Sequence, residues 1–129
     1  MTSGLVDTSV LIHFFRRRPA AEAWFAAQTE QLSVSSITWL EFMDGVPNKL
    51  GQTYCLSILS QFVLIHLTEA DQDWAMHQMA LLRLSAGVHT GDCLIASVCH
   101  RLQVPLYTQN IKDMVKILPA ALIIKPFDA

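Results

Sequence analysis

The sequence predicts an α/β protein with three layers, in which helices cover both faces of a central parallel sheet of about five strands. Short apolar runs alternate along the chain with longer segments of helical periodicity, which is the pattern of parallel strands joined by helical crossovers. The chain has 129 residues, of which 52% are hydrophobic and only 16% charged, so it is too apolar to be disordered. This length is typical of one domain. We therefore expect a single domain over residues 1–129.

The first half of the chain alternates strands with helices. Pro19 suits the first position of a helix, because its ring fixes φ and it has no N–H to leave unbonded. Ser36 or Thr38 is expected to begin another helix, since hydroxyl side chains cap helix N-termini. The elements expected in this half are a strand over residues 4–6, helices over 8–15 and 19–27, a strand over 32–35 and a helix over 37–46.

The second half continues the same alternation. Pro47, Asn48 and Gly51 are expected to interrupt the chain before the next helix. Thr68 can cap a long helix that Gly87 then ends at its C′ position, and Thr90 can cap the helix after it. The elements expected here are helices over residues 52–62, 69–86 and 92–102, strands over 63–67, 104–108 and 121–126, and loops over 88–91 and 109–113.

The charge and the cysteines limit the class of protein. The net charge is −2, so a nucleic-acid partner must be held by a local basic patch or through metal ions. No apolar run approaches the ~18 residues that span a bilayer, and the N-terminus lacks the basic start of a signal peptide. The cysteines Cys55, Cys93 and Cys99 form no CxxC pair. We expect buried, reduced thiols and a cytoplasmic protein without membrane contact.

Asp7 is the first candidate for a functional residue. It follows the first expected strand, where ligands bind in open α/β sheets. A buried carboxylate there needs a cation, hydrogen-bond donors or water. The alternative is that Asp7 is only the N-cap of the helix that follows, although Thr8 or Ser9 could also fill that position.

Three further acids stand at similar junctions: Glu41 in the helix after the second strand, Asp92 at a helix start, and Asp113 after the fourth strand. In a parallel sheet three of the four acids, counting Asp7, lie near one edge, and Glu41 joins them if its helix leans over that edge. Two carboxylates ~4 Å apart repel by roughly 4 kcal/mol at an effective dielectric constant near 20, so such a cluster needs protons or cations. Oxygen ligands alone favour Mg²⁺ or Mn²⁺, which can activate water for phosphodiester cleavage. The alternative is that these acids are ordinary helix caps.

The chain resembles the PIN domain family, and among its members the VapC-like toxins of bacterial toxin–antitoxin pairs. The resemblance covers nearly the whole chain and implies a PIN fold with Mg²⁺- or Mn²⁺-dependent ribonuclease activity. It also implies a homodimer and a VapB-like antitoxin whose tail enters the acidic groove. The motifs that carry it are Asp7-Thr8-Ser9, the segment 37–46 around Glu41, Asp92-Cys93-Leu94-Ile95-Ala96, and the segment 106–114 that ends in Asp113-Met114.

The resemblance implies a role for each acid. Asp7 and Asp92 would be the principal metal ligands, directly or through water. Glu41 would complete the ligand set or orient the water, and Asp113 would hold a water or a second cation. All four are thus expected to be both catalytic and metal-binding.

Neutral side chains would tune these ligands. Thr8 and Thr108 would hydrogen-bond to them. Asn110 stands where some PIN enzymes carry an acid, and its neutral amide lowers the charge of the site. The choice between one and two metal ions therefore stays open. Asp44 is expected to be a solvated acid. His89 is expected to be a structural or surface residue, and the alternative is that it touches the site, since it precedes Asp92 by three residues.

Arg16, Arg17 and Arg18 form the most basic stretch of the chain. Such a triplet is commonly a solvated surface patch. The alternative is that it contacts RNA phosphates beside the Asp7 edge. Trp39, Phe42 and Met43 are expected to serve the core, and partly a dimer or antitoxin contact.

Two alternative functions compete with a ribonuclease. The first is a PIN-like module that binds RNA or protein with little or no catalysis, which Asn110 and the negative net charge favour. The second is a phosphohydrolase of the haloacid dehalogenase type with Asp7 as nucleophile. Such enzymes carry an acid two residues on, where this chain has Ser9.

Overall fold

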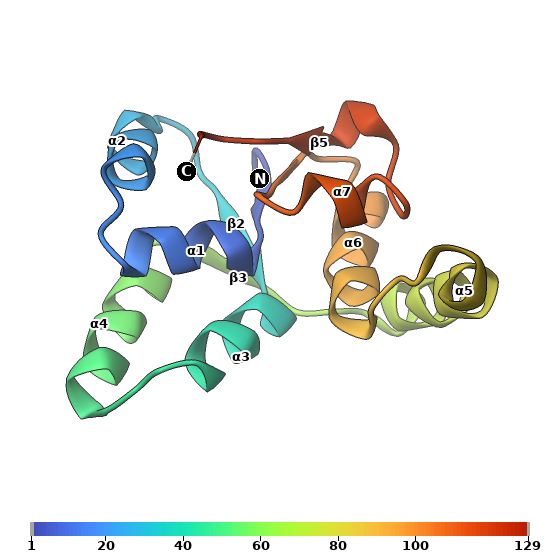
Figure 1. Ribbon diagram of the computed structural model, residues 1–129, viewed down its shortest axis with the longest axis horizontal. Coiled ribbons are helices and arrows are strands. Elements are labelled where there is room, and N and C mark those ends of the chain that lie inside the picture. The colour runs from blue at the N-terminus through green and yellow to red at the C-terminus, as the bar shows by residue number, and fades with distance from the viewer. Residues whose placement is uncertain (1, 129) are drawn as a thin grey trace.

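Residues 2–128 are described by a computed structural model (Figure 1). Its sheet has five parallel strands in the order β3-β2-β1-β4-β5, which confirms the predicted α/β class. The elements are β1 (Leu5–Val6), α1 (Thr8–Phe15), α2 (Pro19–Ala27), β2 (Ser33–Ser35), α3 (Ser36–Asp44), α4 (Lys49–Leu59), β3 (Val63–Ile65), α5 (Glu69–Ala86), α6 (Thr90–Leu102), β4 (Leu106–Tyr107), α7 (Ile111–Met114), the 3₁₀ helix η1 (Ala120–Leu122) and β5 (Ile123–Ile124).

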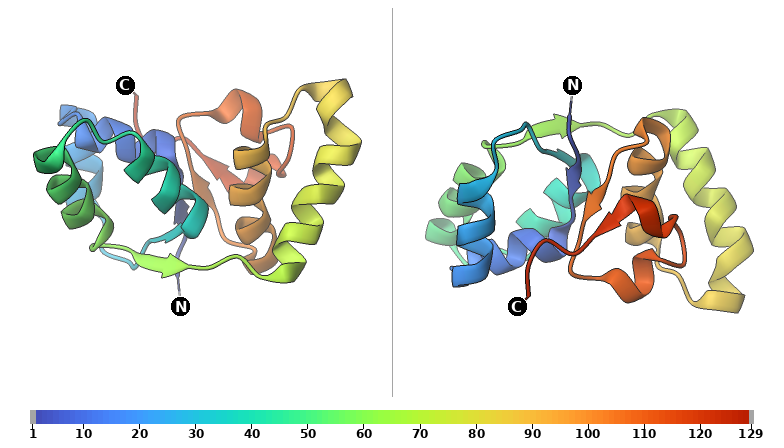
Figure 2. Two further views of the ribbon diagram at one scale, coloured as in Figure 1. Left: turned by 90° about the horizontal axis from the view of Figure 1, so that it is seen from below. Right: turned by 90° about the horizontal axis from the view of Figure 1, so that it is seen from above.

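Two hydrophobic cores lie on the two faces of the sheet. Adjacent residues of β1 belong to different cores, since side chains alternate along a strand. Leu5 packs with residues of α5, α6 and α7, and Val6 packs with residues of α1, α3 and α4. Figure 2 shows these two groups of helices on opposite sides of the sheet. The three-layer architecture therefore agrees with the prediction.

Several predicted boundaries differ from the structure. Gly51 does not interrupt the chain but lies in the first turn of α4, where its N–H donates to the Asn48 side chain at 2.8 Å. Asn48 is thus a cap and not a break. Residues 109–113 were expected as a loop or short turn, but Ile111–Met114 form the short helix α7. The strands are shorter than predicted, and residues 120–122 form a 3₁₀ helix before β5.

The helix caps also differ in part. Ser35, not Ser36 or Thr38, caps α3 and accepts a hydrogen bond from the backbone N–H of Thr38 at 3.1 Å. Thr90 is the first residue of α6, and its expected cap position is taken by His89, which makes no capping bond. Thr68 does form the predicted capping box of α5, together with Asp71.

The burial of the thiols agrees with the expectation from the sequence. Cys55, Cys93 and Cys99 are free and buried. No helix within residues 2–128 has the length and hydropathy that a membrane crossing requires.

Candidate functional site

Asp7 lies at the carboxyl end of the central strand β1 and is 4% exposed. It is the N-cap of α1, so neither Thr8 nor Ser9 has that role: one Asp7 oxygen accepts a bond from the backbone N–H of Thr8 at 2.8 Å. Its other oxygen accepts bonds from the hydroxyls of Thr108 at 2.6 Å and Ser9 at 3.1 Å. Capping and a place in the site are therefore compatible for this residue.

The two hydroxyl donors hold Asp7 in place from the end of β4 and from α1. Thr108 follows β4 and is itself fixed, because its Oγ1 accepts the backbone N–H of Asn110 at 2.9 Å. The Ser9 hydroxyl accepts the backbone N–H of Gln109 at 3.0 Å. Burial raises the pKa of Asp7, and the hydrogen bonds from Thr108, Ser9 and Thr8 partly oppose that rise. The fold thus supplies donors to this carboxylate, and no cationic side chain within residues 2–128 pairs with it.

Asp92 lies in the first turn of α6 and is partly buried. Its pKa is raised to about 6, first by burial and then by the negative charges of Asp7, Asp113 and Glu41, while the neighbouring His89 has the opposite effect. The four predicted acids therefore share one electrostatic environment. A carboxylate in such a position gains most from a bound cation.

Glu41 connects α3 to the other two helices of the site. Its Oε1 accepts a hydrogen bond from the Thr8 hydroxyl at 2.6 Å. A Cβ atom built on Gly91 would lie 2.5 Å from Glu41 Oε2, so any larger residue at this position would displace the end of the Glu41 side chain. The helix bearing Glu41 thus leans over the edge, which is the condition for Glu41 to join the other acids.

Asp113 lies in α7 at the border of the site. Lys116 donates a hydrogen bond to its Oδ1 at 3.2 Å. This bond, assisted by the Asn110 side chain and the nearby charges of Lys116 and His89, lowers the pKa of Asp113 despite the opposing effect of desolvation. The fourth acid therefore has a cationic partner of its own, unlike Asp7.

The donor set fits a hard divalent cation in its chemistry. It consists of carboxylate oxygens with hydroxyl groups behind them, which are the ligands of Mg²⁺ and Mn²⁺. Within residues 2–128, no three His, Cys, Asp or Glu side chains are close enough to hold a metal ion as they stand. The raised pKa of Asp92, caused in part by three other carboxylates, is the observation in favour of a cation here.

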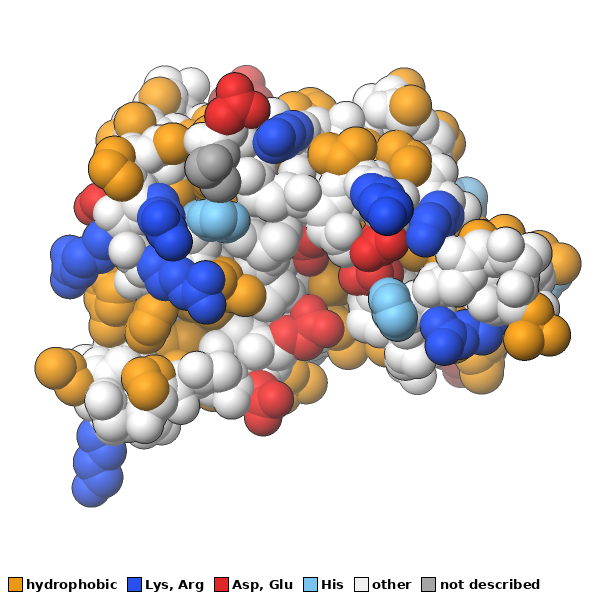
Figure 3. All heavy atoms as spheres, in the orientation of Figure 1, with side chains coloured by type: hydrophobic (Ala, Val, Ile, Leu, Met, Phe, Trp, Pro, Cys, Tyr) orange, Lys and Arg blue, Asp and Glu red, His pale blue; other side chains and the backbone are white. Residues whose placement is uncertain are grey.

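The three arginines diverge. Arg16 lines a pocket together with Glu41, Arg17 lies over the ring of Tyr54 at 4.8 Å, and Arg18 precedes α2 as its N-cap residue. Figure 3 shows acidic side chains in the middle of this face, between the α1/α3 side and the α6/α7 side, with basic side chains on both sides. A polyanion that reaches the acids can thus meet cations on either side.

Some functional contacts were not predicted from the sequence. Ser9 was expected as a possible cap and as part of the Asp7-Thr8-Ser9 motif, yet it joins Asp7 to the loop after β4. Gly91 was expected in a loop but lies in the first turn of α6, and no role was predicted for Lys116. The available signal for Gly91 was a glycine in the first turn of a helix. The available signal for Lys116 was its i, i+3 spacing from Asp113. Asp44 is exposed as expected, and Phe42 is buried in the core with Trp39 and Met43 packed against it.

The fold and the acids define a class of α/β proteins with a carboxylate site at one end of a parallel sheet. The PIN domain family matches residues 4–114. The chain therefore belongs to the PIN domain family, which confirms the resemblance seen in the sequence. No curated protein matches the chain significantly.

Solved structures of toxins share this fold. A chain of a toxin–antitoxin complex from Klebsiella pneumoniae is 26% identical with a TM-score of 0.79, over 98% of this chain and 100% of the other. A chain of DNA-bound VapBC from Salmonella typhimurium is 21% identical with a TM-score of 0.79, over 96% of this chain and 98% of the other. VapC20 of Mycobacterium tuberculosis, a Sarcin-Ricin loop cleaving toxin, is 14% identical with a TM-score of 0.68, over 90% of this chain and 97% of the other. The chain is thus similar to VapC toxins over nearly its whole length.

Proposed function

We propose that this protein is a Mg²⁺- or Mn²⁺-dependent endoribonuclease and the toxin of a VapBC-like pair. The observation that carries the proposal is the electrostatic coupling of Asp92 to Asp7, Asp113 and Glu41 at the carboxyl end of the sheet, in a PIN domain. Carboxylates gathered in this way are costly without a cation, and a cation beside them suits hydrolysis of a phosphodiester.

The residues of the chain would divide the work as follows. Asp7 and Asp92 would hold the metal ion, with Glu41 completing the set or orienting water, and Asp113 holding a water or a second cation. The bound ion would supply an activated water nucleophile and neutralise charge on the phosphate. Thr108 keeps the Asp7 carboxylate in one orientation.

Two further side chains support this arrangement. Thr8 keeps Glu41 turned toward the site through its 2.6 Å hydrogen bond. Asn110 would stand beside Asp113 as a neutral neighbour, so that the charge there stays low. Because Lys116 already pairs with Asp113, we favour one tightly held ion, at Asp7 and Asp92.

Partners follow from the same family. Similar chains were solved in a toxin–antitoxin complex and in VapBC bound to DNA, so we propose a VapB-like antitoxin that inhibits this chain. We also propose that the chain forms a homodimer and works in the cytoplasm, where its three buried thiols stay reduced. Arg16, Arg17 and Arg18 are proposed to contact RNA phosphates.

The test is cleavage of an RNA panel by the purified chain, freed of any antitoxin. We expect cleavage with Mn²⁺ or Mg²⁺, none with EDTA, and a loss of more than about 100-fold in Asp7→Asn and Asp92→Asn. Asp44→Asn is the matched control, because it removes an exposed acid from the same helix as Glu41. Equal cleavage by the native chain and Asp7→Asn would show a contaminant and reject the proposal.

A binding module without turnover is the second candidate. The pairing of Asp113 with Lys116, and Asn110 in place of an acid, favour it because both reduce the negative charge available to metals. Calorimetric titration with Mn²⁺ separates the two candidates. Metal binding that disappears in Asp92→Asn supports the nuclease, and its absence from the native chain supports the module. The phosphohydrolase alternative finds no support, since Ser9 occupies the position of the required acid and donates to Asp7.

A further inference from the structure

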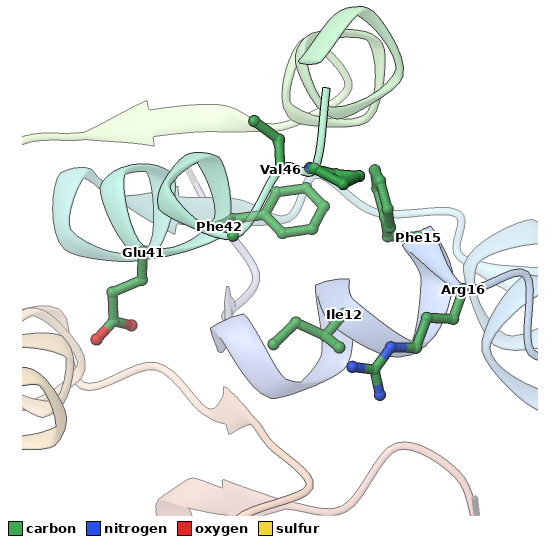
Figure 4. A pocket seen from close by; sticks show the side chains of 8 residues that line it. Ile12, Phe15, Arg16, Glu41, Phe42 and Val46 are labelled. Atoms are coloured by element: carbon green, nitrogen blue, oxygen red, sulfur yellow. The ribbon is translucent and has the colours of Figure 1, made fainter. Parts of the chain in front are cut away.

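An apolar pocket opens beside the acidic site, between α1 and α3. It has a volume of about 260 Å³. Figure 4 shows Glu41 and Arg16 on opposite sides of Ile12, with Phe15, Phe42 and Val46 above them in this view. The residues that line it are Ile12, Phe15, Arg16, Glu41, Phe42, Gly45, Val46 and Pro47.

We propose that this pocket holds one unpaired base of the RNA, that of the nucleotide next to the reacting phosphate. The inference rests on the proposed ribonuclease function and adds a site that selects the substrate. Glu41 forms part of the pocket wall and is also hydrogen-bonded to Thr8, the residue after Asp7. A base in the pocket therefore places its own phosphates at the carboxylates.

The lining suits a flat, largely apolar ring. Phe42 is 5% exposed, and its ring is perpendicular to the Phe15 ring at 90°. The two rings therefore pack edge to face and do not stack face to face across the pocket. Ile12 is 36% exposed at the pocket and offers an apolar surface without a partner among the described residues that covers it. The volume lies just below the ~300–1,000 Å³ of sites for larger ligands, which favours a single ring system. Proteins commonly bind unstacked RNA bases against aromatic side chains.

Charge favours a nucleotide over an apolar side chain of a protein. Arg16 is exposed, lines the pocket and pairs with no carboxylate among residues 2–128. Its guanidinium can stack on a base or bind the adjoining phosphate, two contacts that a purely apolar side chain does not need. Arg17 and Arg18 follow Arg16 in the chain, and although their side chains diverge, they add two cations to the segment that borders the pocket.

The experiment compares RNA that has bases with RNA that lacks them, in EDTA and without metal. Short single-stranded RNAs and the same backbones made from abasic ribose are titrated into the protein, and methyl signals are followed by NMR. We expect ring-current shifts at the Ile12 and Val46 methyls with the base-containing RNA only. Leu56 serves as the reference methyl, since it is 44% exposed and does not line the pocket.

The second part of the experiment uses a variant whose pocket is filled by a larger side chain. Ile12→Trp is expected to weaken binding of the base-containing RNA about 5- to 100-fold, to the level of the abasic RNA, because stacking of one base has a comparable effect. Leu56→Trp, which adds the same ring at an exposed position elsewhere, should bind like the native chain. Far-ultraviolet circular dichroism and the core methyl spectrum verify that both variants fold.

Three results overturn the proposal. They are saturation binding without shifts at Ile12 and Val46, equal affinity for abasic RNA, and unchanged base dependence in Ile12→Trp. If Ile12→Trp keeps its base dependence but escapes inhibition by an antitoxin, the pocket binds protein instead. Because every measurement is made without metal, a chain that binds bases here yet cleaves no RNA refutes the nuclease proposal alone.

Discussion

Asp92 is a carboxylate whose ionisation the fold opposes. Its pKa of about 6 in the folded protein lies above the 3.8 of an unperturbed aspartate, with burial as the first cause and the charges of neighbouring acids as the second. Between these two pH values the folded state binds more protons than the unfolded state, so stability falls as pH rises through this window. The metal-free protein is therefore destabilised at neutral pH by a residue that it would need for catalysis.

Replacing Asp92 by Asn should stabilise the metal-free protein at neutral pH. The pKa difference corresponds to about 3 kcal/mol at full strength. Screening of a partly exposed group reduces the expected gain to about 1–2 kcal/mol. Urea unfolding in EDTA measures it at pH 7.5, and the gain should vanish near pH 4, where the native Asp92 is already protonated.

With metal ions bound, the native chain should become more stable than Asp92→Asn. Mn²⁺ should raise the melting temperature of the native chain and leave Asp92→Asn nearly unchanged, because binding to the folded state adds stability only where the ligand is present. Asp44→Asn is again the control, with no gain expected at either pH. An Asp92→Asn variant that is less stable than the native chain at pH 7.5 would contradict this account of the site.

At the residue scale, sequence spacing was sufficient for some contacts and not for others. An acid directly after a buried apolar run placed Asp7 at the end of a strand, and the structure finds it there. The bond from Thr108 to Asp7 could not be predicted in this way, because Thr108 lies 101 residues away and is brought to Asp7 only by the pairing of β1 with β4. The sequence alone, without the family resemblance, holds no local signal for that bond.

Among the elements, the approach of α3 to α6 determines where Glu41 lies. Gly91 permits it, and its backbone is not in the left-handed region, so alanine is conformationally acceptable there. Gly91→Ala should leave stability unchanged or raise it by up to about 0.5–1 kcal/mol, since alanine favours a helix. Its Cβ would nevertheless displace the Glu41 carboxylate from Thr8.

Gly91→Ala is therefore expected to lower RNA cleavage by at least about 10-fold while the melting temperature holds. Thr90→Ala is the matched control, because Thr90 is exposed at the preceding position and its neighbour His89 provides no capping bond. Native activity in Gly91→Ala would mean that Glu41 needs no fixed position. A large loss of stability would mean that the packing between the helices is tighter than the geometry indicates.

Helices were predicted more accurately than strands, and the reason is physical. Long periodic segments such as α5 have a cap and an end signal in their own sequence, and both Thr68 and Gly87 act as predicted. Strands β1 and β4 have two residues each, so their limits depend on which neighbours pair with them. The helix α7 has four residues and too few apolar positions to show a period.

For the whole molecule, the parallel sheet explains why acids far apart in the sequence meet. The strands all end on the same side of the sheet, so the segments after β1 and β4 and the helices after β2 and β3 begin near that side or return to it.

The two outer strands of the sheet, β3 and β5, each pair with one neighbour only within residues 2–128. Strand β3 is an edge strand, and its residues Val63 and Leu64 are 46% and 42% exposed.

An apolar surface at this edge is where we expect the proposed homodimer to form. A shallow hollow there is lined by Ser36, Trp39, Leu40, Leu64 and His66. Leu40, on the neighbouring helix α3, is 59% exposed. Continuous exposed apolar surface on a folded chain indicates a protein contact, and a twofold dimer would use the same patch on both subunits. The patch lies beside Glu41 in sequence, so dimerisation would also steady the helix that carries it.

Leu64→Glu should therefore convert a dimer into a monomer, with a dimer dissociation constant raised at least about 10-fold, because each interface would bury two unpaired carboxylates. Sedimentation velocity over a range of concentrations measures the change. Leu50→Glu, at an 81% exposed leucine of α4, is the control and should leave the dimer intact. A native chain that stays monomeric at high concentration, or a dimer broken by Leu50→Glu and not by Leu64→Glu, would refute the assignment of this surface.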